Sequence, residues 1–94
     1  MAVRIIVPIQ AAPGKKDELI QVLQTLSREV RQEGGCEQFE IYQSTERPDQ
    51  LALLELWADE AAQKAHSDLN RKRGNASASL TTGVTQYERY ITHP

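Results

Sequence analysis

The stretch GGCEQFEIYQSTERPDQLALLELWADEAAQKAH, residues 34–66, decides the fold. Within it, CEQFEIYQS at 36–44 alternates its side chains with a period of two, which predicts a strand. LALLELW at 51–57 is apolar on both faces apart from Glu55, as is typical of a central strand covered on both sides. Proline and aspartate in the intervening TERPDQ favour a bend, so the spacing predicts a hairpin.

Towards the N-terminus, residues 2–10 also alternate with a period of two and predict a first strand. Pro8 has no backbone N–H, so we expect it near the end of that strand or at an unpaired position. A helix follows and ends at Gly34 and Gly35. Its apolar residues form one stripe at helical spacing: Leu19, Val22, Leu23, Leu26 and Val30.

Towards the C-terminus, Asp59 can cap a second helix that runs from Glu60 to about Leu69. Residues 70–83 predict a short helical segment and a loop, and residues 84–91 predict the last strand. The order β-α-β-β-α-β predicts one α+β domain over residues 1–94 with a ferredoxin-like fold. Two helices then lie on one face of a four-stranded antiparallel sheet.

The other face of that sheet lacks a cover in a single chain, and we therefore expect a homodimer. A chain of 94 residues builds a thin core, and apolar side chains point both ways from residues 51–57. A second copy of the sheet is the simplest cover for the open face.

Charge and composition argue against several classes of function. The chain has 11 basic and 13 acidic residues, a balance that does not favour nucleic-acid binding. We recognise no signal peptide and no run of about 20 apolar residues, so we expect a cytoplasmic protein that does not span a membrane. Cys36 is the only cysteine, which excludes an intrachain disulfide and a cysteine-based zinc site.

Residues 34–66 resemble the central block of the antibiotic biosynthesis monooxygenase family, and VPIQAAPGKKDEL at 7–19 is similar to the family's first strand and turn. The landmarks of the resemblance are Gly35-Cys36, Tyr42, Pro48-Asp49, Glu55, Trp57, Asp59, Ala61-Ala62 and His66. The resemblance implies a dimeric α+β barrel with a small pocket between sheet and helices in each subunit. It also implies oxidation of phenolic or quinol-like compounds with O2, without flavin or metal.

His66 and Glu55 are the candidate catalytic residues. His66 can transfer protons near neutral pH, although Ser67 and Asp68 beside it suggest a wet side of the helix. Glu55 interrupts an apolar strand, so its carboxylate needs a partner or a raised pKa. We favour a structural ion pair with Arg89 or Arg4 over a catalytic base.

Trp57, Tyr42 and Tyr87 are the candidate substrate-binding residues. Trp57 could form an aromatic wall with an N–H donor, or it could be a core anchor for the second helix. The two tyrosines could offer phenol groups to a substrate, although tyrosines at strand spacing more often serve packing or interfaces.

No metal site or cofactor is predicted. The only histidines are His66 and His93. Relatives that degrade haem place an axial histidine after the second helix, and residues 71–80 contain none, which argues against haem degradation.

Three functions remain open on the sequence. The first is a cofactor-free monooxygenase acting on a small phenol or quinol. The second is a non-catalytic protein that binds a small hydrophobic metabolite, because no compact catalytic motif stands out. The third is an isomerase in which His66 shuttles a proton.

Overall fold

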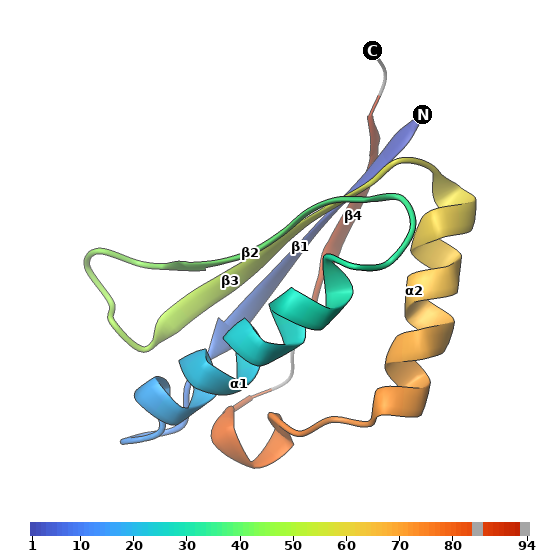
Figure 1. Cartoon of the computed structure of the whole chain (residues 1–94). Helices are drawn as coiled ribbons and strands as arrows, with labels where there is room; N and C mark the ends of the chain where they lie inside the picture. Colours follow the sequence, from blue (N-terminus) through green and yellow to red (C-terminus); the bar gives the residue numbers. More distant parts are fainter. Residues whose placement is uncertain (84–85, 93–94) are drawn as a thin grey trace.

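The chain follows the predicted order of strands and helices (Figure 1). The computed structural model describes residues 1–83 and 86–92. Its elements are the strands β1 (Ala2–Gln10), β2 (Cys36–Gln43), β3 (Gln50–Trp57) and β4 (Glu88–Thr92), the helices α1 (Lys16–Val30) and α2 (Glu60–Arg73), and the short 3-10 helix η1 (Ala78–Leu80). The strands form one antiparallel sheet in the order β2-β3-β1-β4, which confirms the predicted fold.

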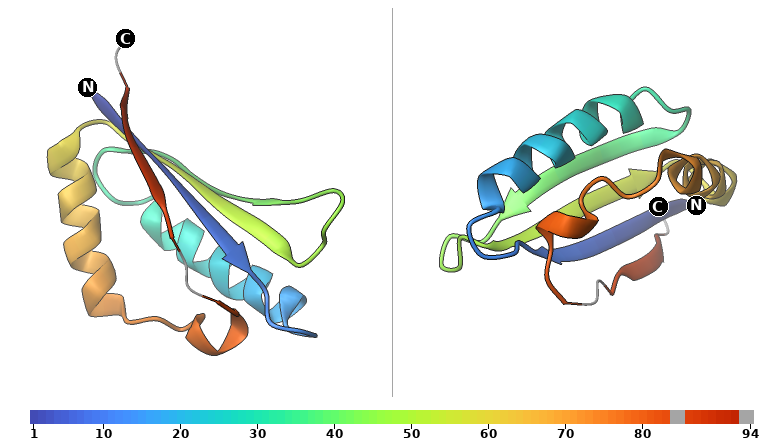
Figure 2. Two further views of the ribbon diagram at one scale, coloured as in Figure 1. Left: turned by 180° about the vertical axis from the view of Figure 1, so that it is seen from behind. Right: turned by 90° about the horizontal axis from the view of Figure 1, so that it is seen from below.

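The two faces of the sheet have different surroundings. Both helices lie on one face, as the right-hand view of Figure 2 shows. Along β3 each buried residue alternates with a half-buried one, because successive side chains point to opposite faces. The core lies between this helix-covered face and the helices, and it includes Val3, Ile5, Ile9, Leu19, Leu23, Val30, Phe39, Leu51, Leu53 and Trp57.

The opposite face, called here the outer face, lacks such a cover in the single chain. By strand register it carries Ile6 from β1 together with Leu54 and Leu56 from β3, all half-buried. Tyr42 and Tyr90 stand on the same face and are 47% and 49% exposed. An apolar strip flanked by tyrosines is therefore open to solvent.

Helix α2 begins where the sequence predicts and ends later. The Asp59 side chain accepts a hydrogen bond from the backbone N–H of Ala62 at 2.8 Å, which confirms the predicted cap. The helix continues to Arg73 instead of stopping near Leu69. Residues 70–73 contain no helix breaker, and the chain leaves the helix at Gly74, where φ is +76°.

The last strand is shorter than predicted. It begins at Glu88, while Gln86 and Tyr87 lie outside it, and Val84 falls outside the described residues. Pairing of β1 with β4 reaches only to Ile6 opposite Glu88. The same register would bring Gln86 opposite Pro8, which has no N–H to donate, and at Pro8 the described part of β1 pairs with β3 alone.

The turn between α1 and β2 packs closely against the start of α2. Gly35 has a φ of +80°, and a Cβ placed there would lie 2.4 Å from the Cβ of Ala62. The backbone N–H of Ala58 also donates to the carbonyl of Gly35 at 2.8 Å. Only glycine fits this position, so the turn holds α2 at a fixed distance from the end of α1.

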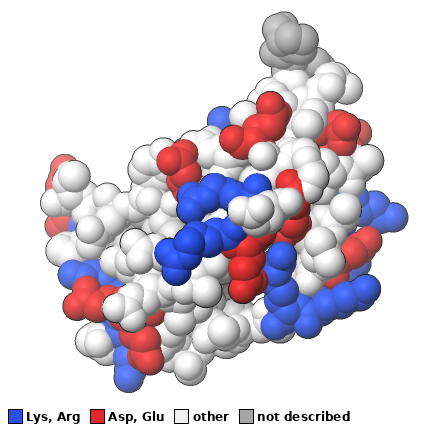
Figure 3. All heavy atoms as spheres, in the orientation of Figure 1, with Lys and Arg blue, Asp and Glu red and all other residues white. Residues whose placement is uncertain are grey.

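Charges of both signs are interspersed over the face drawn in Figure 3. Among the described helices, none is long and apolar enough to cross a membrane.

Candidate active site

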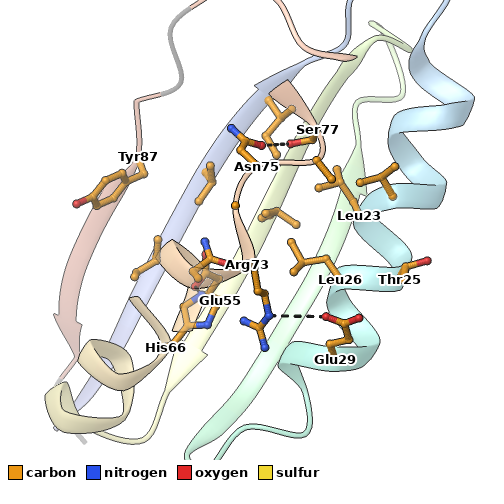
Figure 4. Close-up of a pocket in the computed structure, with 18 of the residues that line it drawn as sticks. Leu23, Thr25, Leu26, Glu29, Glu55, His66, Arg73, Asn75, Ser77 and Tyr87 are labelled. Atoms are coloured by element: carbon orange, nitrogen blue, oxygen red, sulfur yellow. Dashed lines mark hydrogen bonds and ion pairs between the residues drawn. The ribbon is translucent and has the colours of Figure 1, made fainter. Parts of the chain in front are cut away.

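A cavity of about 1240 Å³ opens between the helix-covered face of the sheet, α1, α2 and the loop that follows α2 (Figure 4). One wall is apolar and is formed by Ile5, Val7, Ile9, Val22, Leu23, Leu26 and Leu53. Polar side chains line the wall formed by α2 and its following loop: Gln63, Ser67, Asn70, Asn75 and Ser77. The cavity therefore suits a small molecule with an apolar body and polar substituents.

His66 and Glu55, the two predicted catalytic residues, lie together at this cavity. Both line it, and both are nearly inaccessible, with 6% of each residue exposed. His66 Nε2 lies 3.7 Å from Glu55 Oε1. Although Ser67 and Asp68 predicted a wet side of α2, the His66 side faces the sheet and is buried.

Trp57 contacts both residues of this pair. Its indole stacks on the His66 ring with centroids 4.5 Å apart and planes at 25°. Its Nε1–H donates a hydrogen bond to Glu55 Oε1 at 3.0 Å. Trp57 is fully buried and is absent from the residues that line the cavity, so its contacts are with the two candidate catalytic groups.

The predicted ion pair of Glu55 with Arg89 or Arg4 is wrong. Arg4 projects to the outer face, where its guanidinium contacts Gln38 and, at 3.4 Å, only the backbone carbonyl of Glu55. Arg89 pairs instead with Glu60, at 3.1 Å. Burial raises the pKa of the Glu55 carboxyl, while the Trp57 N–H and His66 act in the opposite direction.

Glu33 is a member of the cluster that the sequence did not predict. Its Oε1 lies 3.0 Å from His66 Nδ1, and its side chain is 10% exposed. Arg73 Nη2 lies 2.7 Å from Glu33 Oε2, without the alignment of a hydrogen bond. Glu33 comes three residues after Val30, so the apolar stripe of α1 continues onto a carboxylate, and that is the signal that could have found it.

Comparison with known proteins supports the fold and shows the family of this chain. The sequence profile of the antibiotic biosynthesis monooxygenase family matches residues 2–90. The chain belongs to this family. The Bacillus subtilis (strain 168) protein named "Putative monooxygenase YcnE" is 30% identical over 66 residues, which cover 70% of each chain.

Solved structures share the fold of this antibiotic biosynthesis monooxygenase family member over almost its whole length. A conserved protein of Methanosarcina mazei Go1 has a TM-score of 0.88 at 27% identity, covering 99% of this chain and 94% of its own. PA3566 of Pseudomonas aeruginosa has a TM-score of 0.81 at 27% identity, covering 99% and 95%. A Deinococcus radiodurans protein described as a "putative antibiotic biosynthesis monooxygenase" has a TM-score of 0.88 at 21% identity. The match covers 98% of this chain and 93% of that protein, and it supports the fold alone.

The two candidate tyrosines of this family member lie in different places. Tyr87 is among the residues that line the cavity and is 64% exposed, so it stands at the margin. Tyr42 is on the outer face, where its hydroxyl donates to Glu40 at 3.3 Å. The sheet therefore separates Tyr42 from His66 and Glu55 within one chain.

The other histidine, cysteine and acidic side chains that the structure describes form no second candidate site in this family member. Within residues 1–83 and 86–92, no group of three histidine, cysteine or acidic side chains is arranged to hold a metal ion. His93 lies outside the described residues. Burial raises the pKa of the Cys36 thiol, and the nearby Glu33 and Glu55 raise it further, which favours the unreactive protonated form.

Proposed function

We propose that this protein is a cofactor-independent monooxygenase that oxidises a small phenol or quinol with O2. The observation that carries the proposal is the buried pair of His66 and Glu55 at one end of a largely apolar cavity. Membership in the antibiotic biosynthesis monooxygenase family supports the same reaction type.

The cavity walls suit a flat, oxygenated aromatic ring. Its apolar face can lie on the isoleucine, leucine and valine side chains of the sheet and α1, while its hydroxyl groups face α2. The phenolic proton then passes to one group of the pair of His66 and Glu55, since both residues line the cavity. The phenolate is electron-rich and transfers an electron to O2 beside the apolar wall of the cavity.

The reaction balances without a further reductant. A phenol with a free para C–H and one O2 gives a quinone and one water. One oxygen atom becomes the new carbonyl and the other leaves as water, while the ring loses the phenolic hydrogen and the para hydrogen. A quinol with a free ring C–H and one O2 likewise gives a hydroxyquinone and one water: one oxygen atom becomes the new hydroxyl group, and the two original hydroxyl hydrogens leave in the water. The substrate itself supplies all the electrons.

The test is oxygen uptake by metal-free protein with a panel of small quinols under ¹⁸O2. We expect uptake above the uncatalysed rate, with one labelled atom in the product, and a fall of about 100-fold or more in Glu55→Gln. Glu46→Gln is the matched control, since Glu46 is exposed in the turn between β2 and β3. No stimulation by any quinol would overturn the proposal.

The alternatives of isomerase and binding protein make different predictions in the same assay. A histidine with a carboxylate near each ring nitrogen can also move protons without oxygen. An isomerase would incorporate solvent deuterium into its substrate under anaerobic conditions. A non-catalytic protein would carry a ligand, detected by native mass spectrometry, that air leaves unchanged.

We also propose that the protein acts as a homodimer joined through the outer face. The half-buried Ile6, Leu54 and Leu56 support this arrangement, because a second sheet would remove them from water. The outer face also carries Arg4, Glu40 and Glu88, so its charges can complement those of a second copy.

A further inference from the structure

The buried ring of His66 has two unlike neighbours. On one side Glu33 Oε1 lies 3.0 Å from Nδ1, within hydrogen-bond distance. On the other side Glu55 Oε1 lies 3.7 Å from Nε2, which is too long for a direct hydrogen bond. Glu55 lines the cavity and Glu33 does not. Nδ1 is therefore within hydrogen-bond distance of Glu33, while Nε2 lies on the side of Glu55, which lines the cavity, without a direct hydrogen bond to it.

We propose that Glu33 is a positioning residue that fixes the tautomer and orientation of His66, so that Nδ1 carries the hydrogen and Nε2 exchanges protons in the cavity. The catalytic consequence rests on the proposed function, but the tautomer does not.

The direction of the hydrogen bond follows from the chemistry of Glu33. An ionised carboxylate only accepts hydrogen bonds, so the imidazole must donate from Nδ1. The Arg73 guanidinium, 2.7 Å from Oε2, supplies a counter-charge to this carboxylate. In the neutral ring, Nε2 is then the nitrogen with a free lone pair.

Aromatic contacts fix the plane of the ring but cannot choose between its nitrogens. Trp57 stacks on one face, and Phe39 meets the ring edge-on with centroids 5.9 Å apart. A half-turn about the ring axis would preserve both contacts while exchanging the positions of nitrogen and carbon. Among the described residues, the contact with Glu33 is the one within direct hydrogen-bond distance that distinguishes the two orientations.

The charged groups facing this cluster come from four elements. Glu55 is on β3 and Arg73 ends α2, while Glu33 lies in the turn after α1. Glu29, on α1, is 3.7 Å from Arg73 Nε and has no contact with His66. Glu29→Gln is therefore a matched control, because it removes a carboxylate from Arg73 and leaves the imidazole bond intact.

The test is ¹⁵N NMR of the histidine side chains, in which His93→Gln assigns His66 because the chain has only two histidines. In the wild type we expect a protonated Nδ1 and an unprotonated Nε2 in the neutral ring. Glu33→Ala should shift His66 towards the Nε2–H tautomer, and Glu29→Gln should leave it unchanged. A wild-type His66 that carries its hydrogen on Nε2 would overturn the proposal.

Glu33→Gln separates positioning from simple structural support. The amide oxygen can still accept from Nδ1, so the tautomer should persist in this variant. For a protein active on quinols, we expect turnover to fall about 10- to 100-fold in Glu33→Ala and less in Glu33→Gln. An unchanged His66 spectrum in both variants would contradict the proposal, whatever the activity.

The two proposals fail independently. If the wild type consumes no oxygen but shows the Nδ1–H tautomer, the proposed function fails and Glu33 keeps its positioning role. If the protein oxidises quinols with the opposite tautomer, the role of Glu33 fails alone.

Discussion

The indole N–H of Trp57 donates to Glu55 at 3.0 Å, although these residues are two positions apart on the same strand. Positions i and i+2 of a strand point to one face, so the donor that satisfies the buried carboxylate is supplied by its own strand. The strand therefore places the polar group in the core together with a partner for it.

Trp57→Phe should weaken both the fold and the control of Glu55. The ring can still stack on His66, but the buried Glu55 carboxylate loses its donor, at a cost of about 1–3 kcal/mol in the free energy of unfolding. The pKa of Glu55 should rise further, because this N–H favours the ionised form. Urea unfolding measures the loss, and Tyr87→Phe, at a site that is 64% exposed and away from the outer face, is the control expected to change stability by less than about 0.5 kcal/mol.

Glu55→Gln should stabilise the protein increasingly as pH rises. Burial raises the folded-state pKa of Glu55 above its ordinary value of 4.5, so the folded state holds this proton more tightly than the unfolded chain does. The contribution of Glu55 to wild-type stability is therefore fully present below about pH 4.5 and is lost as the pH rises through the folded-state pKa. Glutamine does not titrate, and its side-chain oxygen can still accept from Trp57.

Denaturant unfolding between pH 4 and 8 measures this effect of Glu55→Gln. The advantage of the variant should grow by about 1.4 kcal/mol for each unit by which the folded-state pKa is raised, and then level off. A difference that is constant with pH would contradict the raised pKa.

Gly35→Ala should be markedly more destabilising than Gly14→Ala. Both glycines have positive φ, +80° and +74°, so alanine costs about 1–2 kcal/mol of backbone strain at either position. Only at Gly35 would the new Cβ meet Ala62, and that overlap should add about 1–3 kcal/mol. Thermal unfolding of the two variants compares them, and equal losses would show that the turn does not press on α2.

Leu54→Lys should prevent dimer formation while leaving each chain folded. Leu54 is half-buried on the outer face, where a lysine can reach solvent in the single chain but would be desolvated between two sheets. Light scattering after size-exclusion chromatography measures the mass, with the exposed Thr45→Lys as control. A wild-type mass of one chain would rule out the homodimer.

The fold could be read from the sequence because its signals are local. Period-two alternation, one helical stripe and a capping aspartate each involve neighbouring residues, and they placed β3, α1 and the start of α2 correctly. The start of β4 depended on Pro8 of a distant strand, and local periodicity did not include that constraint.

The site could be predicted only in part. Glu55 stood out as a charge in an apolar strand, and His66 as a landmark of the family. Glu33 lies beyond the end of α1 and acts on a residue 33 positions away, so only the folded chain reveals its contact. Arg73 stands in the basic run Arg71-Lys72-Arg73, a pattern typical of a solvated surface, yet its side chain is only 24% exposed.

Within Glu60–Arg73, His66 is the only buried residue, so α2 packs on the sheet largely through a residue of the candidate active site. Local opening of this helix would separate His66 from Glu33 and Glu55 at once, without unfolding the sheet. Amide hydrogen exchange in α2 should therefore be faster than in β1 and β3, and a ligand that contacts His66 should slow it. The cluster would then exist only in the fraction of molecules with a docked helix, and ligand binding would enlarge that fraction.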